Sequence, residues 1–175
     1  QPAVSVDIVD EDGNPIAKKS ASMRNFLTDL YRFYHLFPYR NEGENPFRAN
    51  LFLLDNPSFS SVFNDPAYLH ELAAFCLELG GAVRAHGLWM QLPHTPERLK
   101  CLGDCCRRMK RWEEAVEHYD NYLLSEGENE KVLRHLALCH FFLKHYDDAL
   151  VHLIHLEAIV PDDFDLQVHT AACFM

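Results

Sequence analysis

The side chains best able to do chemistry are cysteines and histidines in the second half of the chain. Cys101, Cys105 and Cys106 are close in sequence, and on a helix Cys101 and Cys105 share one face. A tetrahedral zinc site needs a second ligand pair at comparable spacing, and neither a CxxC pair nor such a second pair is present. We interpret these thiols as small buried hydrophobic residues, with metal ligands or redox thiols as the alternative.

Histidines form a second group further along the chain. His152 and His155 have i, i+3 spacing, with Asp148 one turn earlier and His140 and His145 before them. This arrangement could bind a divalent ion adventitiously, but His140 falls on a core position of the repeat described below. We therefore expect packing or surface roles, and the sequence predicts no metal and no cofactor.

No motif of an enzyme is present. Glu113, Glu114 and Glu117 form a carboxylate group, but they lie near an expected helix start, where the helix dipole favours negative charge. A GxSxG elbow, a Walker loop, a dinucleotide-binding glycine motif, HExxH and an EF-hand loop are all absent. The sequence predicts a protein that is not an enzyme, and a metal-dependent hydrolase is the least favoured alternative.

Composition limits the classes of partner. The 175 residues are 48% hydrophobic and 24% charged, which is typical of a globular domain. The net charge of -10 disfavours binding to nucleic acid, and no run of 18 apolar residues predicts membrane insertion. Six cysteines without the spacing of a disulfide scaffold indicate reduced thiols, and hence a cytoplasmic location.

The elements that position these residues are mostly helices. Residues 168–175 contain no Gly, Asn or Pro that would end a helix, so we expect the natural chain to continue there. The expected organisation is a hairpin or tail at 1–20, an aromatic-rich helical cap at 21–65, a divergent helix pair at 66–95, and repeats at 96–175 with the last one truncated.

An internal repeat organises the second half. Residues 96–129 match residues 130–163 without a gap, at a period of 34. A small residue in each helix, Gly103 against Ala115 and Ala137 against Ala149, would let two antiparallel helices approach closely. The matching positions are Leu99, Leu102, Gly103, Cys106, Trp112, Ala115, Tyr119 and Tyr122 with Leu133, Leu136, Ala137, His140, Tyr146, Ala149, Leu153 and Leu156.

At these residues the sequence resembles the tetratricopeptide repeat family. It departs from the family pattern where Leu replaces the opening Trp twice, where Cys106 or His140 replaces an aromatic residue, and where Gly127 stands in place of a Pro. The resemblance implies an all-α superhelix, a solenoid of antiparallel helix pairs, that serves protein–protein interaction. Residues 164–175 look like the first helix of a third unit.

In such an array the first helix of each pair lines a concave groove. When the positions expected to be buried are set aside, cations and apolar side chains remain on the open face of these helices. Single cations on a helix are often only solvated, however. Lys100 and Lys131 match part of the carboxylate clamp of some family members, but Asp104 stands where the clamp has Asn, so we predict no chaperone-tail binding. The candidate peptide-binding residues are Lys100, Asp104, Arg107, Arg108, Lys131, Arg134, Leu138 and Phe141.

The sequence therefore predicts a scaffold or adaptor module that binds a peptide or partner domain in the concave face. The alternative is a non-catalytic regulatory or structural segment of a larger protein that packs against another domain of the same chain. A protein or peptide partner is expected in either case. The oligomeric state is left open.

Overall fold

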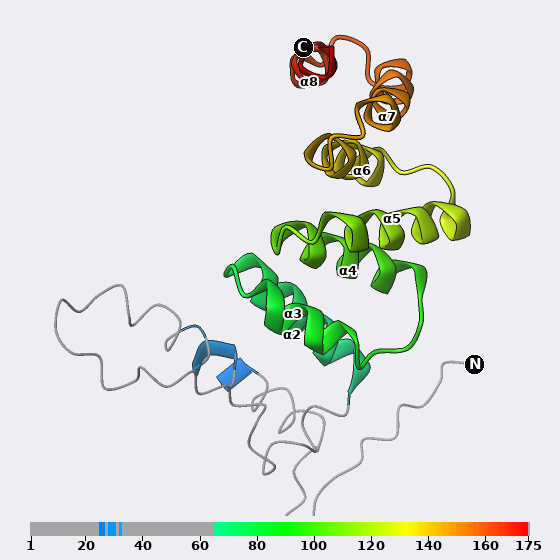
Figure 1. Cartoon of the computed structure of the whole chain (residues 1–175). Coiled ribbons are helices and arrows are strands. Elements are labelled where there is room, and N and C mark those ends of the chain that lie inside the picture. Colours follow the sequence, from blue (N-terminus) through cyan, green and yellow to red (C-terminus); the bar gives the residue numbers. More distant parts are fainter. Residues whose placement is uncertain (1–24, 27, 31, 33–64, 175) are drawn as a thin grey trace, which may run out of the picture. The chain divides into compact units, whose positions relative to one another are not determined.

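The computed structural model describes residues 25, 26, 28–30, 32 and 65–174 (Figure 1). The expected hairpin or tail at 1–20 and most of the expected cap at 21–65 lie outside these residues; the described positions between 25 and 32 are helical. The chain divides into two units, Gln1–Leu69 and His70–Met175, which are treated separately. The helices with defined bounds are α2 (Pro66–Glu78), α3 (Ala82–Trp89), α4 (Pro96–Arg108), α5 (Trp112–Glu126), α6 (Glu130–Phe142), α7 (Tyr146–Ile159) and α8 (Phe164–Cys173).

Three helices begin with the same kind of side-chain cap. The Thr95 hydroxyl accepts the backbone N–H of Arg98 at 3.2 Å, as expected for the start of α4. Asn129 caps α6 and Asp163 caps α8 in the same way, each 34 residues after the previous cap. The first helices of these three units thus start at equivalent positions, which keeps the repeat in register.

The turns between paired helices also repeat. Lys110 and Lys144 have φ values of 61° and 63° at the ends of α4 and α6, and Gly80 has 84° at the end of α2. A left-handed residue at this point ends the first helix and reverses the chain toward the second. The predicted pair within 66–95 therefore uses the same turn as the later units, although it is offset by 30 residues instead of 34.

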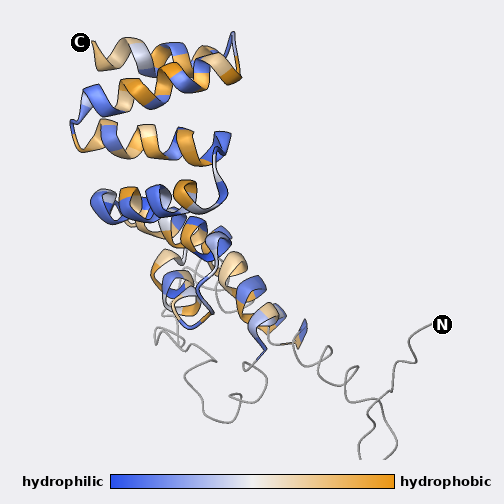
Figure 2. Cartoon of the chain, turned by 90° about the vertical axis from the view of Figure 1, so that its right-hand side faces the viewer, coloured by the Kyte–Doolittle hydropathy of each residue, from blue (hydrophilic) through white to orange (hydrophobic). Residues whose placement is uncertain are grey.

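The buried positions confirm the all-α, tetratricopeptide-like array. In Figure 2 hydrophobic and hydrophilic residues alternate along the helices of the array, as expected when each helix has one buried face. No strand occurs among the described residues. The equivalent buried sets are Leu72, Leu102 and Leu136; Ala73, Gly103 and Ala137; Ala85, Ala115 and Ala149; Trp89, Tyr119 and Leu153; and Leu92, Tyr122 and Leu156.

One close contact of Gly103 is not predicted from the sequence. The sequence predicts Ala115 opposite Gly103, and in the structure a Cβ at Gly103 would lie 2.6 Å from the ring of Tyr119, one turn further along α5. Glycine is needed here because a large aromatic ring fills the space that a side chain would occupy. In the next unit Ala137 and the smaller Leu153 stand at the equivalent positions, within one buried cluster. The size of the residue on the second helix thus sets the size tolerated on the first.

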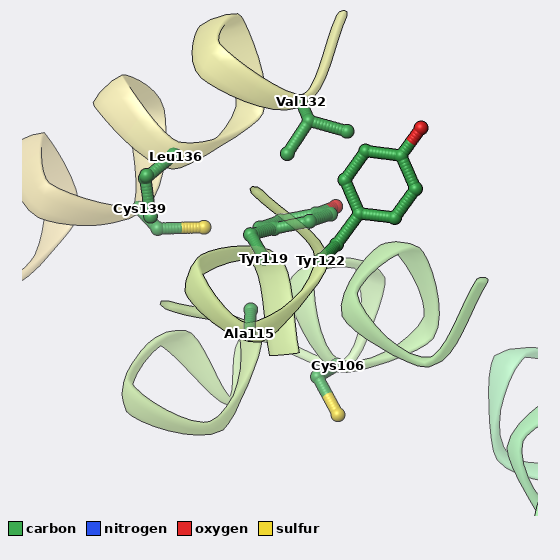
Figure 3. Packing of buried hydrophobic residues seen from close by; sticks show 7 residues of the cluster. All are labelled: Cys106, Ala115, Tyr119, Tyr122, Val132, Leu136 and Cys139. Carbon is green, nitrogen blue, oxygen red and sulfur yellow. The ribbon is translucent and has the colours of Figure 1, made fainter. Parts of the chain in front are cut away.

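Successive units share a core. Side chains of α4, α5 and α6 form one buried cluster that contains Cys106, Ala115, Tyr119 and Leu136 (Figure 3). Each helix pair buries its apolar surface against the next pair, as in stacked repeats generally. Within the described part of the chain, no helix combines the length and the apolar character that crossing a bilayer requires.

Candidate functional site

The eight predicted binding residues all lie on first helices, four on α4 and four on α6, and these two helices contact each other. We call the surface that these eight residues define the inner face. Their side chains differ sharply in what they already contact. Those contacts decide which of them are available to a ligand.

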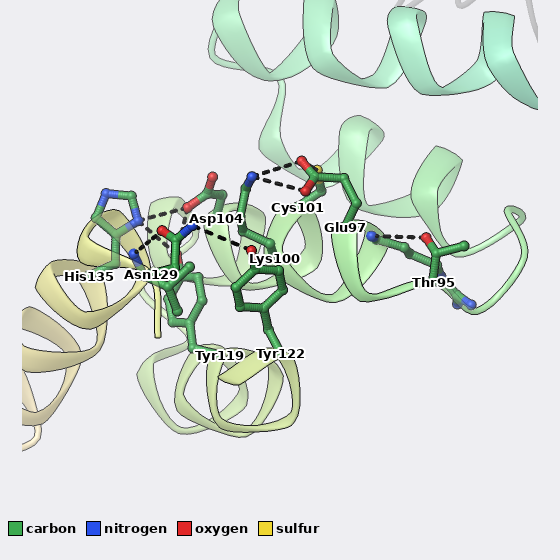
Figure 4. A network of polar contacts seen from close by, with 11 residues as sticks. Thr95, Glu97, Lys100, Cys101, Asp104, Tyr119, Tyr122, Asn129 and His135 are labelled. Carbon is green, nitrogen blue, oxygen red and sulfur yellow. Dashed lines mark hydrogen bonds and ion pairs between the residues drawn. The ribbon is translucent and has the colours of Figure 1, made fainter. Parts of the chain in front are cut away.

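Asp104 joins α4 to its neighbours through a buried polar network (Figure 4). Its carboxylate accepts a hydrogen bond from the Tyr119 hydroxyl at 2.6 Å and lies 2.9 Å from Nδ1 of His135 on α6. Burial alone would raise the pKa of this carboxyl, but the contacts with His135 and Tyr119 outweigh it and lower the pKa. Asp104 therefore acts as an anionic tie between α4, α5 and α6.

Replacing Asp104 with Asn should test this tie. Because the folded-state pKa is lowered, the carboxylate stabilises the fold above its unfolded pKa, and this contribution disappears as the pH falls through the lower folded value. We expect Asp104→Asn to lower the free energy of unfolding by about 1–3 kcal/mol at neutral pH, with a smaller difference near pH 3. Urea unfolding at both pH values measures this. The matched control is Glu117→Gln, which removes an exposed carboxylate on α5; equal losses in the two variants would contradict the tie.

Two of the predicted cations tie repeats together. Arg134 forms ion pairs with Glu130 at 3.1 Å and with Asp163, the cap of α8, at 2.9 Å. Arg108 donates from its guanidinium to the carbonyl of Leu77 near the end of α2. Both guanidinium groups have structural partners, so a ligand would have to compete with those contacts.

Lys100 is also engaged. Its ammonium lies 2.8 Å from a carboxylate oxygen of Glu97 and 6.0 Å from the centre of the Tyr122 ring (Figure 4). The hydrogen bond with Glu97 raises the pKa of this lysine. Since Lys100 is held by Glu97 and Asp104 is held by Tyr119 and His135, these side chains are not arranged as a carboxylate clamp.

The other four residues of the inner face, Arg107, Lys131, Leu138 and Phe141, make fewer polar contacts within the described part of the chain. Lys131 is exposed and makes no ion pair within residues 65–174. Leu138 and Phe141 are half-buried on the same face of α6, and the Phe141 ring contacts Phe142 and Tyr146 edge-on. Arg107 has a buried Nε without a hydrogen-bond partner among the described residues, although its guanidinium interacts with the Tyr119 hydroxyl. This part of the inner face combines a free cation with apolar surface.

Several structural roles have no signal in the sequence. His135 is an ordinary polar residue in the repeat pattern, yet it completes the Asp104 network. Arg98 carries a charge, yet it is 4% exposed and donates to the Met90 carbonyl at 3.3 Å. Its partner lies in the loop before α4, and only the folded chain brings the two together.

Five of the six cysteines are buried, and they include Cys101, Cys105 and Cys106, which the sequence analysis interprets as buried. Cys101, Cys105, Cys106 and Cys139 are at most 8% exposed, and no disulfide occurs among the described residues. Burial raises the pKa of Cys101 and Cys139 to about 12 and raises that of Cys105 and Cys106 as well. In the absence of a metal these groups are neutral thiols at physiological pH, so they are poor nucleophiles.

Solved structures show which class of fold this is: a tetratricopeptide-like helical array. A chain of the APC/C hetero-tetramer Cut9–Hcn1 matches at a TM-score of 0.58 and 19% identity, over 67% of this chain and 25% of that chain. MamA AMB-1 matches at a TM-score of 0.57 and 18% identity, over 62% of each chain. PcrH in complex with the chaperone-binding region of PopB matches at a TM-score of 0.50 and 19% identity, over 62% of this chain and 91% of that chain.

The chain thus spans about a quarter of the matched chain in the Cut9–Hcn1 complex and less than two thirds of MamA. No protein-family model matches the chain, and no curated protein matches it. Identities of this size show a shared fold, and the function has to be argued from the surface itself.

Proposed function

We propose that the chain is a protein-interaction module that binds an extended peptide, or a segment of a partner, along the inner face. Four residues carry the binding: Arg107 on α4 and Lys131, Leu138 and Phe141 on α6. The ligand class is a peptide with a carboxylate close to an apolar side chain. The proposed role is that of a non-catalytic scaffold or adaptor.

The observation that supports this most directly is the combination of side chains on α6. Lys131 is exposed and unpaired within the described part of the chain, while Leu138 and Phe141 follow it at helical spacing and keep part of their apolar surface open. A peptide carboxylate can meet the ammonium while an apolar side chain covers the phenyl ring. PcrH, which shares the fold, binds a region of PopB, so arrays of this kind accept protein segments.

Peptide selection followed by substitution tests the proposal. Peptides selected from a random phage-displayed library on the 175-residue chain should contain an Asp or Glu near an apolar residue. We expect Lys131→Glu to weaken their binding about tenfold, because the charge reversal turns attraction into repulsion. Phe141→Ala should weaken it about thirtyfold, because an apolar anchor is lost. Fluorescence anisotropy with a selected peptide measures both effects.

Matched controls separate the inner face from the rest of the surface. Lys110→Glu makes the same charge change in the turn after α4, and Phe164→Ala removes a ring that is 73% exposed on α8. Both controls should bind as the unsubstituted chain does. A library that yields no binder, or peptides that bind the Lys131→Glu and Phe141→Ala variants with undiminished affinity, would rule out this surface. Arg134 is unsuitable for the test because it holds the cap of α8.

A second candidate function rests on α8. Phe164, Val168 and Phe174 are 73%, 48% and 75% exposed there, an apolar surface suited to covering by another helix. This favours a segment of a larger protein that packs against another domain. Limited proteolysis of a longer natural chain distinguishes the two, because protection of α8 favours packing. For either function we propose the cytoplasm, where buried free thiols remain reduced.

A further inference from the structure

Away from the inner face, three potential metal ligands from three different helices converge. His86 lies on α3, Cys106 on α4 and His118 on α5. One nitrogen of each imidazole and the sulfur of Cys106 all lie within 4.8 Å of one another. Since α3 belongs to one repeat unit and α4 and α5 to the next, the group lies across the junction of two units.

The separation fits a small tetrahedral ion after modest side-chain rotation. With Zn–S of about 2.3 Å and Zn–N of about 2.0–2.1 Å, tetrahedral ligand atoms lie about 3.3–3.7 Å apart. Distances of up to 4.8 Å would have to shorten to these values on binding, through rotation about the side-chain bonds of the two half-buried histidines. The sulfur is fully buried, whereas both imidazoles are half-buried, so an ion would enter from the histidine side.

The ring nitrogens of both histidines are also available for metal binding. Neither the His86 imidazole nor the His118 imidazole makes a hydrogen bond among the described residues. A cysteine binds a metal as the thiolate, so binding must release the proton of Cys106. Of the charges that face the group, Glu114 and Glu117 favour a cation, whereas Arg111 and Arg98 oppose it; Glu114 and Arg111 pair with each other.

Two other groups of potential ligands are weaker candidates. In the group of His70, Glu97 and Cys101, the carboxylate already pairs with the ammonium of Lys100. In the group of His140, His145 and Asp148, two of the three members are exposed. Among the described residues, only the group of His86, Cys106 and His118 combines ligands from three helices, a buried thiol and two imidazoles without hydrogen bonds.

We propose that His86, Cys106 and His118 bind one zinc-class divalent ion, with water as the fourth ligand. Histidine and cysteine side chains together select borderline-soft ions such as Zn²⁺ over Mg²⁺ or Ca²⁺. The ion links α3 of one unit to α4 and α5 of the next. Its role is structural, and zinc should raise the thermal midpoint of the array because it binds only the folded chain strongly.

Titration of the metal-free 175-residue chain with Co²⁺ tests the site. We expect one equivalent to give the sulfur-to-cobalt charge-transfer band and the visible bands of four-coordinate Co²⁺, and Zn²⁺ to abolish both. Cys106→Ala should remove the charge-transfer band, and His118→Leu should weaken binding at least about tenfold. Leu is chosen because Leu88 stands at the position equivalent to His118 in the preceding unit.

Matched cysteine variants locate the ion. Cys105→Ala and Cys101→Ala remove neighbouring buried thiols and should keep the charge-transfer band. A missing band in the unsubstituted chain, a band that survives Cys106→Ala, or a band lost in Cys101→Ala would overturn the proposal. If Cys106→Ala fails to fold by far-ultraviolet circular dichroism, X-ray absorption of the zinc-loaded natural chain decides. One sulfur at about 2.3 Å with two imidazole nitrogens supports the site, and any other sulfur or imidazole count overturns it.

Discussion

Replacing Leu136 with Ala is expected to lower the free energy of unfolding by about 2–5 kcal/mol. Leu136 is 0% exposed and lies in the cluster that joins α4, α5 and α6 (Figure 3). Removing three carbons there loses the transfer free energy of the side chain and leaves a cavity. Neighbours such as Tyr119 cannot fill it easily, because the ring is anchored to Asp104 through its hydroxyl.

Urea unfolding followed by circular dichroism measures the loss. The matched control is Leu124→Ala on α5, where the side chain is 85% exposed and the expected change is within about 0.5 kcal/mol. Because each repeat contacts mainly its neighbours, the Leu136→Ala transition should also broaden as coupling between units weakens. Similar losses in the two variants would show that the shared core between units is not where we place it.

Replacing Gly103 with Ala is expected to cost about 1–3 kcal/mol, although an Ala in a helix is normally more stable than a Gly by about 1 kcal/mol. The added Cβ would lie 2.6–2.9 Å from three atoms of the Tyr119 ring. That ring is fully buried, so it has little room to move. The close approach of α4 and α5 therefore depends on the absence of a side chain at Gly103.

Gly87 on α3 provides the matched control, because a Cβ there would meet no atom within 4 Å. Gly87→Ala should stabilise the chain by about 0.5–1 kcal/mol. The cost of Gly103→Ala should be smaller in a Tyr119→Leu background than in the unsubstituted chain, since Ala137 and Leu153 form that combination one unit later. Urea unfolding of the single and double variants measures the coupling; strict additivity would indicate that the ring is not the obstacle.

The repeat architecture could be predicted from the sequence because its signals are local and periodic. Thr95 marks the start of α4 through its cap and the following proline, and Ala115 and Ala149 are both 0% exposed, as equivalent small positions should be. Such signals depend on the spacing along one helix and on the 34-residue period. They require no knowledge of which distant residue lies opposite.

The inner face could be predicted only in part. Periodicity places Arg134 and Asp104 on the open side of their helices, but it does not reveal that each already has a partner from another helix. Asp163 lies 29 residues after Arg134, and Leu77 lies 31 residues before Arg108. Whether a surface cation is free to bind a ligand depends on these long-range contacts, which the repeat pattern does not contain.

The start of α4, the register of the repeats and the burial of Cys101, Cys105 and Cys106 could be predicted from the sequence, since these follow from spacing within single helices. The contacts between side chains of different helices became visible in the folded chain alone: Gly103 with the Tyr119 ring, Asp104 with His135, and Cys106 with two histidines. The stacking angle between helices sets these contacts, and that angle results from the packing of many side chains at once.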